Sequence, residues 1–292
     1  MLTQPSKGRH LSERDVIKSA ARAALSARTK LGYPLGEPCC VYDAIERAEI
    51  ELRFVDIPSL EGLYASAEVP SILVSIHRPP GRRRLTAAHE LGHHWFADGT
   101  RVDQLASETL PVAGKTEEEL KADVFGSFFL MPKSLVLTAF ERRGWSIATL
   151  TPEQVFVVAG WLGVGYSSLI THLRFSLRLI SFGQAAALMA VAVKHVRRNV
   201  IGRAVLHEGI VVDEQWTGRP VDASVGDVLR VPPRSLLDGN IGELSETAGV
   251  SYVTLTAPGL GRVDNGEWAA YVRVSERDFV GRAIFRHLPR ED

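Results

Sequence analysis

Two histidines and a glutamate have the types and the spacing needed to bind a metal ion and activate water. The chain reads His89-Glu90-Leu-Gly-His93, which places the histidines four residues apart. If this stretch is helical, both imidazoles lie on one face about 6 Å apart and can reach one ion. A catalytic zinc site has three protein ligands and one open position. Glu90 is then the candidate general base, which takes a proton from water as the water attacks a polarised carbonyl.

The alternative is a surface helix whose histidines share no role. The composition of the stretch is evidence against this, because most sides of the helix are apolar: Leu85, Ala88, Leu91, Gly92, Trp95 and Phe96. Such a helix is expected to be buried, and buried histidines and a buried glutamate need partners or a metal to offset lost hydration. The sequence therefore predicts a metal site with His89 and His93 as ligands. His94 is expected to point away from the metal face.

A third ligand is expected from a second predicted helix, which begins Thr116-Glu117-Glu118-Glu119 and continues to Asp123. Glu119 and Asp123 would share a helix face, so one can bind the metal while the other accepts the Nδ1–H of a ligating histidine. The same residues also fit a capping box, in which Thr116 and Glu119 begin the helix. Spacing alone leaves Glu117 and Glu118 open as alternatives to Glu119.

These motifs together resemble the ImmA/IrrE family of zinc-dependent peptidases. They occur in the family's order over residues 35–135: Leu85-Thr-Ala-Ala-His-Glu-Leu-Gly-His93, Glu119-Leu-Lys-Ala-Asp123-Val-Phe and Phe129-Leu-Met-Pro132. The resemblance implies that Glu119 is the third ligand and that Asp123 supports the site. Family members cleave helix-turn-helix repressors of mobile elements or stress regulons, so a repressor of this kind is the implied protein substrate. Two histidines and a glutamate would also accept manganese or another divalent ion in place of zinc.

Composition indicates a globular protein with more than one domain. The chain has 292 residues, of which 45% are apolar and 23% charged, as is usual for soluble proteins. The formal net charge is zero, so no overall field favours nucleic acid or an anionic membrane. The adjacent Cys39 and Cys40 form no disulfide framework, and a buried pair is favoured over metal ligation. With no apolar signal region at the start, the sequence predicts a cytoplasmic protein without membrane association.

The pattern along the chain predicts an α+β fold in three parts. Residues 1–145 are expected to form a small zincin-like peptidase domain after a disordered tail at 1–10. Its predicted elements before the metal helix are helices at 12–30 and 41–48 and strands at 51–57, 62–65 and 71–76. Strand 71–76 is predicted to be the sheet edge that holds an extended substrate, and the alternative is an ordinary core strand. Tyr64 is a weak candidate for stabilising the developing oxyanion.

Residues 146–197 are predicted to form a helical, helix-turn-helix-like domain, with a helix beginning at Thr151-Pro152 and a second over 169–179. DNA recognition requires a basic, polar second helix. The polar residues available there are Ser167, Ser168, Thr171, His172, Arg174 and Arg178. A DNA-binding transcriptional regulator is therefore the alternative function, and a packing or repressor-docking role is favoured over it. A further apolar helix is expected over 183–197.

Residues 198–292 are predicted to form a mostly β domain. The expected strands are 201–206, 209–212, 227–231, 252–256 and 268–274. IrrE-type proteins carry a GAF-like sensor domain in this position, so the resemblance implies a regulatory role, although no motif here names a ligand. Arg82, Arg83 and Arg84 precede the metal helix. A solvated turn is favoured for them over contacts with an acidic substrate or with the acidic run at 117–119.

Overall fold

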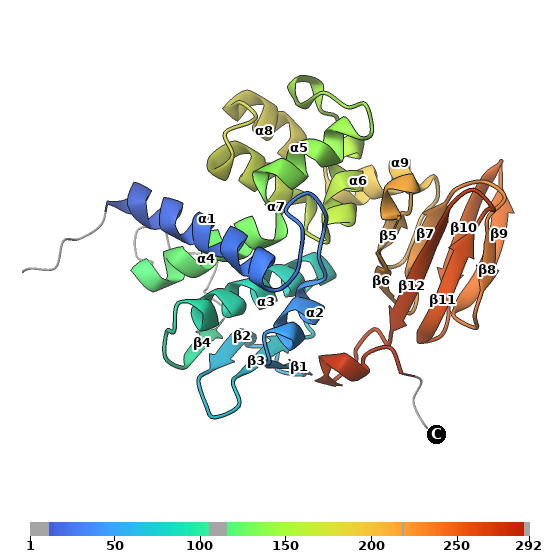
Figure 1. Ribbon diagram of the computed structural model, residues 1–292. Coiled ribbons are helices and arrows are strands. Elements are labelled where there is room, and N and C mark those ends of the chain that lie inside the picture. The colour runs from blue at the N-terminus through green and yellow to red at the C-terminus, as the bar shows by residue number, and fades with distance from the viewer. Residues whose placement is uncertain (1–11, 105–115, 218, 289–292) are drawn as a thin grey trace, which may run out of the picture.

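The computed structural model describes residues 12–104, 116–217 and 219–288 (Figure 1). The tail predicted at 1–10 lies outside these residues. The fold is α+β, as predicted: helices and a mixed sheet contain the metal-binding motif, a group of helices follows, and the C-terminal third is rich in strands. The figure shows these three parts side by side, with the motif helix α3 (Pro80–Trp95) close to the middle.

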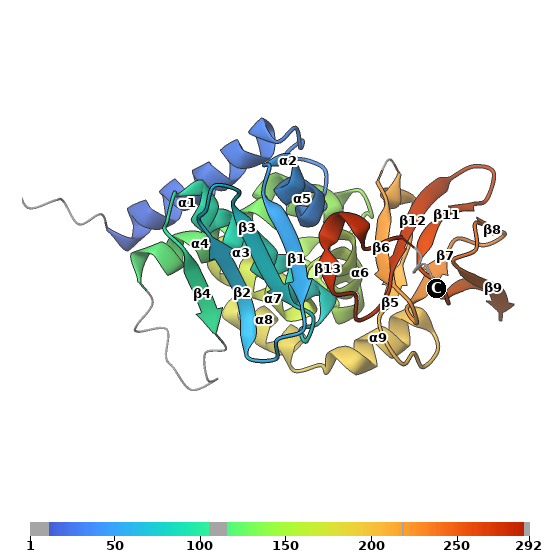
Figure 2. The ribbon, with the colours of Figure 1, turned by 90° about the horizontal axis from the view of Figure 1, so that it is seen from below.

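A five-stranded sheet supports α3. Its order is β13-β1-β3-β2-β4. Its strands are β1 (Glu51–Val55), β2 (Leu60–Ala65), β3 (Ser71–Ser75), β4 (Arg101–Gln104) and β13 (Gly281–Arg282). Buried and partly exposed residues alternate along β1 and β2, because one face of each strand packs on the core. Figure 2 shows this sheet with the helices behind it.

The prediction that residues 71–76 form the substrate-binding edge is wrong. β3 pairs in parallel with β1 on one side and antiparallel with β2 on the other. The edge lies one strand farther out because β4 pairs with β2. A strand of four residues, Arg101–Gln104, is too short to show a clear alternation. Within the described residues, β4 and β13 are the edges of this sheet.

The N-terminal helices pack on α3 and on each other. They are α1 (Glu13–Lys30), α2 (Val41–Arg47), α4 (Glu117–Leu130) and α5 (Lys133–Glu141). Ser12 caps α1 by accepting from the Asp15 amide. Arg28 of α1 is fully buried and donates to the carbonyl oxygens of Phe129 at 2.6 Å and Pro34 at 2.8 Å. Because a guanidinium offers several donors in a fixed geometry, one side chain fastens α1 to the end of α4.

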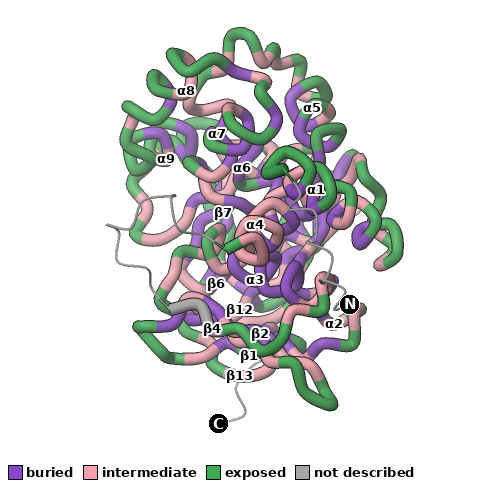
Figure 3. The backbone as a smooth tube through the Cα atoms, turned by 90° about the vertical axis from the view of Figure 1, so that its left-hand side faces the viewer, coloured by how far each residue is buried: buried purple, intermediate pink, exposed green. Residues whose placement is uncertain are grey.

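The stretch Glu117–Glu141 is long and apolar enough in composition to cross a membrane. More than half of its most apolar window, 56%, is buried inside the protein. Phe125 and Phe129 in this stretch are fully buried and stack with ring centroids 5.8 Å apart. The apolar residues therefore serve the interior of a globular fold, and Figure 3 shows α3 buried beside α4 at the centre of the molecule.

The middle of the chain is helical. Its elements are α6 (Pro152–Leu162), α7 (Tyr166–Thr171) with a π-helical extension (His172–Ser176), α8 (Phe182–Met189) and α9 (Val193–Ile201). The predicted start of α6 is confirmed: Thr151 and Gln154 form a capping box and Pro152 follows the cap. The prediction of a single helix over 183–197 is wrong, because the helix is interrupted between Met189 and Val193 and two helices, α8 and α9, result. No proline or glycine marks this break, so composition could not reveal it.

The C-terminal third forms two four-stranded sheets, with orders β5-β7-β10-β9 and β6-β12-β11-β8. The strands are β5 (Gly209–Val211), β6 (Val221–Ser224), β7 (Val228–Val231), β8 (Leu236–Asp238), β9 (Gly242–Thr247), β10 (Val250–Leu255), β11 (Gly259–Asp264) and β12 (Ala269–Ser275). The strand predicted at 201–206 is wrong, because α9 continues to Ile201 and ends at Gly202, whose φ is 84°. Glycine tolerates this left-handed conformation and commonly ends helices.

The segment 281–286 packs against the N-terminal part of the chain. Gly281 and Arg282 of β13 pair antiparallel with Phe54 and Arg53 of β1. Arg286 is buried and its guanidinium lies 2.9 Å from a carboxylate oxygen of Asp43 in α2. These N-terminal and C-terminal segments are thus joined by strand pairing and by a partly buried ion pair.

Candidate metal centre

The helix α3 carries the three motif residues into the core. It begins with Pro80, whose fixed φ suits the first turn of a helix. His89 is 9% exposed, whereas Glu90 and His93 are fully buried. The burial predicted from the apolar composition of this helix is therefore observed. His94 is only half-buried and its Nδ1 contacts the Tyr64 hydroxyl at 3.1 Å, apart from the histidine pair.

His89, His93 and Glu119 converge on one point. The two Nε2 atoms lie 3.1 Å apart, and the Glu119 carboxylate oxygens lie 3.3 Å from Nε2 of His89 and 3.5 Å from Nε2 of His93. Ligand atoms bound tetrahedrally to zinc at ~2.0–2.1 Å are about 3.3 Å from one another. One donor atom from each of the three residues lies within 4.8 Å of the others. The donor set and its spacing therefore fit a divalent metal ion.

Two glycines allow α4 to come close enough to α3 for this cluster to form. A Cβ on Gly126 would lie 3.0 Å from the His89 amide nitrogen, and one on Gly92 would lie 3.1 Å from the Ala122 Cα. Both distances are shorter than ordinary van der Waals contact, so a larger residue would push the helices apart. These two glycines thus allow α4 to bring Glu119 next to the histidines.

The acidic run at the start of α4 divides into three different roles. Glu117 forms an ion pair with Lys121 at 2.7 Å. The pKa of Glu118 is lowered, first by a hydrogen bond with its own backbone and second by a hydrogen bond with the Thr116 side chain. Only the Glu119 side chain reaches the histidines among these three. Thr116 does cap the helix by accepting from the Glu119 amide at 3.3 Å. The cap predicted from Thr116 is present, while the Glu119 carboxylate belongs to the cluster.

Each histidine also contacts a second carboxylate through its Nδ1 atom. Asp123 Oδ1 lies 3.0 Å from Nδ1 of His89, at the position predicted for a supporting acid. Asp98 Oδ2 lies 2.9 Å from Nδ1 of His93, a partner that the sequence analysis did not identify. Its place just after α3 was the available signal, since a short polar residue there can turn back on the last helical turn. Both carboxylates fix Nδ1 as the protonated nitrogen and leave Nε2 for the cluster.

Glu90 lies between α3 and the sheet. Its carboxylate packs against the backbone of β2, where a Cβ on Gly62 would be only 2.2 Å from Glu90 Oε1. The methyl group of Thr86 fills the neighbouring space, 2.6 Å from the same imagined Cβ. Tyr64, the suggested oxyanion donor, also lies on β2 but directs its hydroxyl to His94.

The remaining predicted features have structural roles. Cys39 and Cys40 are free thiols, and burial raises the pKa of both. Arg82 contacts Glu61 at 2.6 Å instead of the acidic run of α4, and Arg84 donates to the carbonyl oxygen of Asp222 at 3.1 Å. The arginines therefore occupy the junction between the first domain and the strands of the C-terminal third.

One face of the second helix of the helix-turn-helix-like pair is packed inside the protein, while the candidate residues Ser167, Thr171 and Arg178 are exposed. Tyr166, Leu169, Ile170 and Leu173 are buried, and so is His172, which was a candidate for a polar recognition surface. A Cβ on Gly81 of α3 would lie 2.6 Å from the Gly165 amide nitrogen, so the turn before α7 presses on the start of the metal helix. This packing adds nothing in favour of DNA recognition.

Comparison with known proteins agrees with the motifs. The family model of the IrrE N-terminal-like domain, Peptidase_M78, matches residues 45–167. No curated protein matches the chain. A solved Mycobacterium tuberculosis transcriptional regulator is similar at 16% identity over 55% of this chain and 46% of its own, with a TM-score of 0.31. This chain thus spans less than half of that protein, and the likeness is too low to indicate a shared role. Residues 45–167 of this chain are therefore similar to the IrrE N-terminal-like domain, in agreement with the resemblance to the ImmA/IrrE family.

Proposed function

We propose that this chain is a zinc-dependent endopeptidase that cleaves a specific intracellular protein. The observation that carries the proposal is the convergence of His89, His93 and Glu119, with a buried glutamate next to the first histidine. Two imidazoles and one carboxylate leave an open position, which distinguishes catalytic sites from closed structural ones. Manganese would suit the same donors, and the metal content of the purified protein decides between the two ions.

The residues around the cluster have defined tasks in this proposal. A divalent ion, when bound, supplies Lewis acidity that polarises a carbonyl and lowers the pKa of water. Glu90 accepts the proton of the attacking water and delivers it to the leaving amine. Asp98 and Asp123 keep the two histidines in the tautomer that presents Nε2. The carboxylate of Glu90 is held in one place by its contact with the backbone at Gly62.

The position of the peptide substrate follows from the corrected sheet order. β2 contacts Glu90 through Gly62 and pairs with β4 on its outer side. An extended peptide could add to the side of β4 that faces away from β2, which pairs with no other described strand. Such pairing uses backbone hydrogen bonds and needs few side-chain contacts. β4 thus replaces β3 as the proposed substrate strand.

The proposed substrate is a helix-turn-helix transcriptional repressor, and its cleavage would release the genes of a stress response or a mobile element. This part rests on the resemblance to the family and on the match to residues 45–167. We place the reaction in the cytoplasm, where such repressors act. DNA binding by the chain itself is not part of the proposal, because the formal net charge is zero and no overall field favours nucleic acid.

A comparison of protein N-termini in cells tests the proposal. Cells that express the wild-type chain are compared with cells that express Glu90→Gln, and new N-termini are identified by mass spectrometry. We expect new termini within a repressor in wild-type cells only. The purified repressor should then be cut by the purified wild-type chain, and a chelator should stop the cleavage.

The matched control is Glu61→Gln, a glutamate on β2 that pairs with Arg82 and takes no part in the cluster. This variant should produce the same new termini as the wild type. Equal cleavage by Glu90→Gln and the wild type would overturn the mechanism, and identical N-termini in both kinds of cell would overturn the peptidase assignment.

A further inference from the structure

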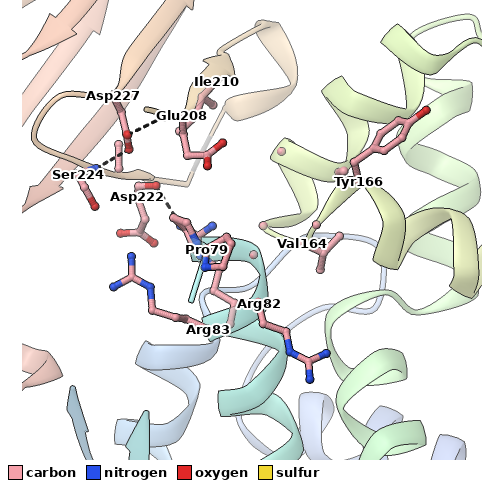
Figure 4. Close-up of a pocket in the computed structure, with 18 of the residues that line it drawn as sticks. Pro79, Arg82, Arg83, Val164, Tyr166, Glu208, Ile210, Asp222, Ser224 and Asp227 are labelled. Carbon is pink, nitrogen blue, oxygen red and sulfur yellow. Dashed lines mark hydrogen bonds between the residues drawn. The ribbon is translucent and has the colours of Figure 1, made fainter. Parts of the chain in front are cut away.

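A cavity of about 640 Å³ lies away from the metal cluster, at the junction of the three parts of the chain. Its walls come from the start of α3, the turn between α6 and α7, and the strands β5 and β6. Figure 4 shows Pro79, Arg82 and Arg83 entering from α3, Val164 and Tyr166 from the helices, and Asp222 and Asp227 from the β domain. None of the three candidate metal ligands lines it.

Cationic side chains without a carboxylate partner face this cavity. Among the described residues, no carboxylate oxygen lies within 4.0 Å of the guanidinium nitrogens of Arg83, Arg84 or Arg219. Arg84 and Arg219 instead donate to the carbonyl oxygens of Asp222 and Trp161. The other lining arginines are paired: Arg82 with Glu61, Arg197 with Glu208 and Arg286 with Asp43. In Figure 4 Arg82 and Arg83 leave α3 in different directions, and Arg83 extends toward the side where Asp222 lies.

The lining carboxylates do not cancel this charge. Asp222 forms a two-pronged contact with Arg273 at 2.6 and 2.7 Å, and Asp227 pairs with Arg277 at 2.7 Å. Glu208 is held by Arg197 at 3.1 Å. Glu276 is the remaining lining carboxylate. Asp222 also attracts Arg84 and Arg219. The cavity lining nevertheless has six arginines and four carboxylates, which leaves an excess of positive charge in a confined space.

Burial removes water from Arg219 and from one nitrogen of Arg83. Burial lowers the pKa of Arg219 to about 10, and its guanidinium stacks over the Trp216 ring with its carbon 4.4 Å from the ring centroid. Arg83 Nε is buried and makes no hydrogen bond with any described residue, and its guanidinium lies over the Phe54 ring at 5.9 Å. A desolvated cation without a counter-ion is costly, so an anion that entered would relieve this cost.

The walls of the cavity also offer flat apolar surface. The aromatic residues that line it are Tyr42, Phe54, Phe156, Tyr166, Trp216 and Phe279. Guanidinium groups recognise phosphate oxygens through paired donors, while rings stack on other flat groups. The volume is within the range usual for small-molecule sites.

We propose that this cavity binds a small phosphorylated molecule with a flat apolar portion, such as a nucleotide, between the arginines of α3 and the β domain. Arg83, Arg84 and Arg219 contact the phosphate, and the aromatic walls hold the flat part. The ligand would touch the first turns of the same helix that carries His89 and His93 farther along, and it would bridge this helix to β6. The proposal concerns binding and does not require the chain to be a peptidase.

Isothermal titration calorimetry on the full chain with AMP tests the proposal, with adenosine and inorganic phosphate as the two halves of the probe. We expect AMP to bind at least tenfold more tightly than either half. Arg83→Gln and Arg84→Gln should each weaken AMP binding by about tenfold, which corresponds to the loss of one contact to a charged group. The matched control Arg198→Gln removes an exposed arginine of α9 that does not line the cavity, and its affinity should equal that of the wild type.

The same variants separate the cavity from the metal centre, which could itself attract phosphate. His93→Ala should bind AMP as the wild type does, because His93 does not line the cavity. Failure of AMP to bind the wild type, or equal AMP affinity in Arg83→Gln, Arg84→Gln and the wild type, would overturn the proposal. Loss of AMP binding in His93→Ala alone would assign the phosphate to the metal centre and would also overturn it.

Discussion

The missing side chain of Gly62 makes room for the carboxylate of Glu90. A methyl group at position 62 would sit 2.2 Å from Oε1 of Glu90, well inside any permitted contact. Since residue 62 is on β2 and residue 90 is on α3, the contact also sets how closely this helix approaches the sheet. A residue outside the sequence motif thus constrains the proposed general base.

Gly62→Ala should lower cleavage by about a hundredfold or more, because general base catalysis contributes on the order of 10²–10⁴ and the base would be displaced. Bound metal should remain near the wild-type amount. If the methyl acts through Glu90, the double variant with Glu90→Gln should be no less active than Glu90→Gln alone. Gly160→Ala is the control, since a Cβ there would meet nothing within 4 Å. Unchanged kcat/KM in Gly62→Ala would contradict the constraint.

The acidic run of α4 offers three neighbouring substitutions with different expected results. Glu119→Gln should lose most bound metal, because it removes the charged ligand at the histidine pair. Glu117→Gln and Glu118→Gln should keep it, since their side chains serve Lys121 and the Thr116 cap. Elemental analysis of the three purified variants distinguishes them. Full metal content in Glu119→Gln would remove this residue from the ligand set.

Asp98→Asn should weaken metal affinity by about 10–100-fold, the usual cost of removing a carboxylate behind a ligating histidine. Competition with a chromophoric chelator measures the dissociation constant. Asp56→Asn is a matched control, because Asp56 also contacts a histidine, His77 at 2.6 Å, but at an exposed position and outside the cluster. An equal effect in both variants would argue against a specific role for Asp98.

We predict that protonation of His172 lowers the stability of the protein in mild acid. Burial lowers its pKa from 6.5 to about 4, and its Nε2 contacts the Met131 carbonyl oxygen at 2.9 Å. Because the unfolded chain takes up the proton more readily, this contribution to stability is complete above pH 6.5 and is lost as the pH falls to about 4. The full effect is on the order of 3 kcal/mol.

Urea unfolding of the metal-free chain at pH 7.5 and pH 5 measures this effect. The difference in unfolding free energy between the two pH values should shrink in His172→Asn and stay unchanged in His195→Asn, which alters an exposed histidine of α9. The same pH difference in His172→Asn as in the wild type would refute the assignment.

Local signals predicted the elements that depend on neighbouring residues. Ser12 and Thr151 cap helices where expected, since capping is decided within a few residues. The pair His89 and His93 is likewise set by one helical turn. Glu119 needed the family resemblance, because Glu117 and Glu118 have the same chemistry and only the packing of α4 on α3 separates them.

Features that depend on distant parts of the chain could not be read in this way. β3 became a central strand because β4 joined the sheet beyond β2. Asp98 meets His93 only after the chain reverses at Ala97, whose φ is 55°. Arg84 donates to the carbonyl oxygen of Asp222 in β6, more than a hundred residues away in the sequence. Residues 45–167 match the family, yet the partners of the metal helix extend well beyond this segment.

The pairing of β13 with β1 bears on any attempt to isolate the peptidase region. A chain cut after residue 201 would uncover the outer backbone of β1 and would take the guanidinium of Arg286 away from Asp43. Unpaired strand edges can form hydrogen bonds with strands of other copies, so a shortened protein should tend to self-associate. The smallest folding unit that contains the histidine pair is therefore discontinuous, and its two pieces enclose the whole of the helical and β regions.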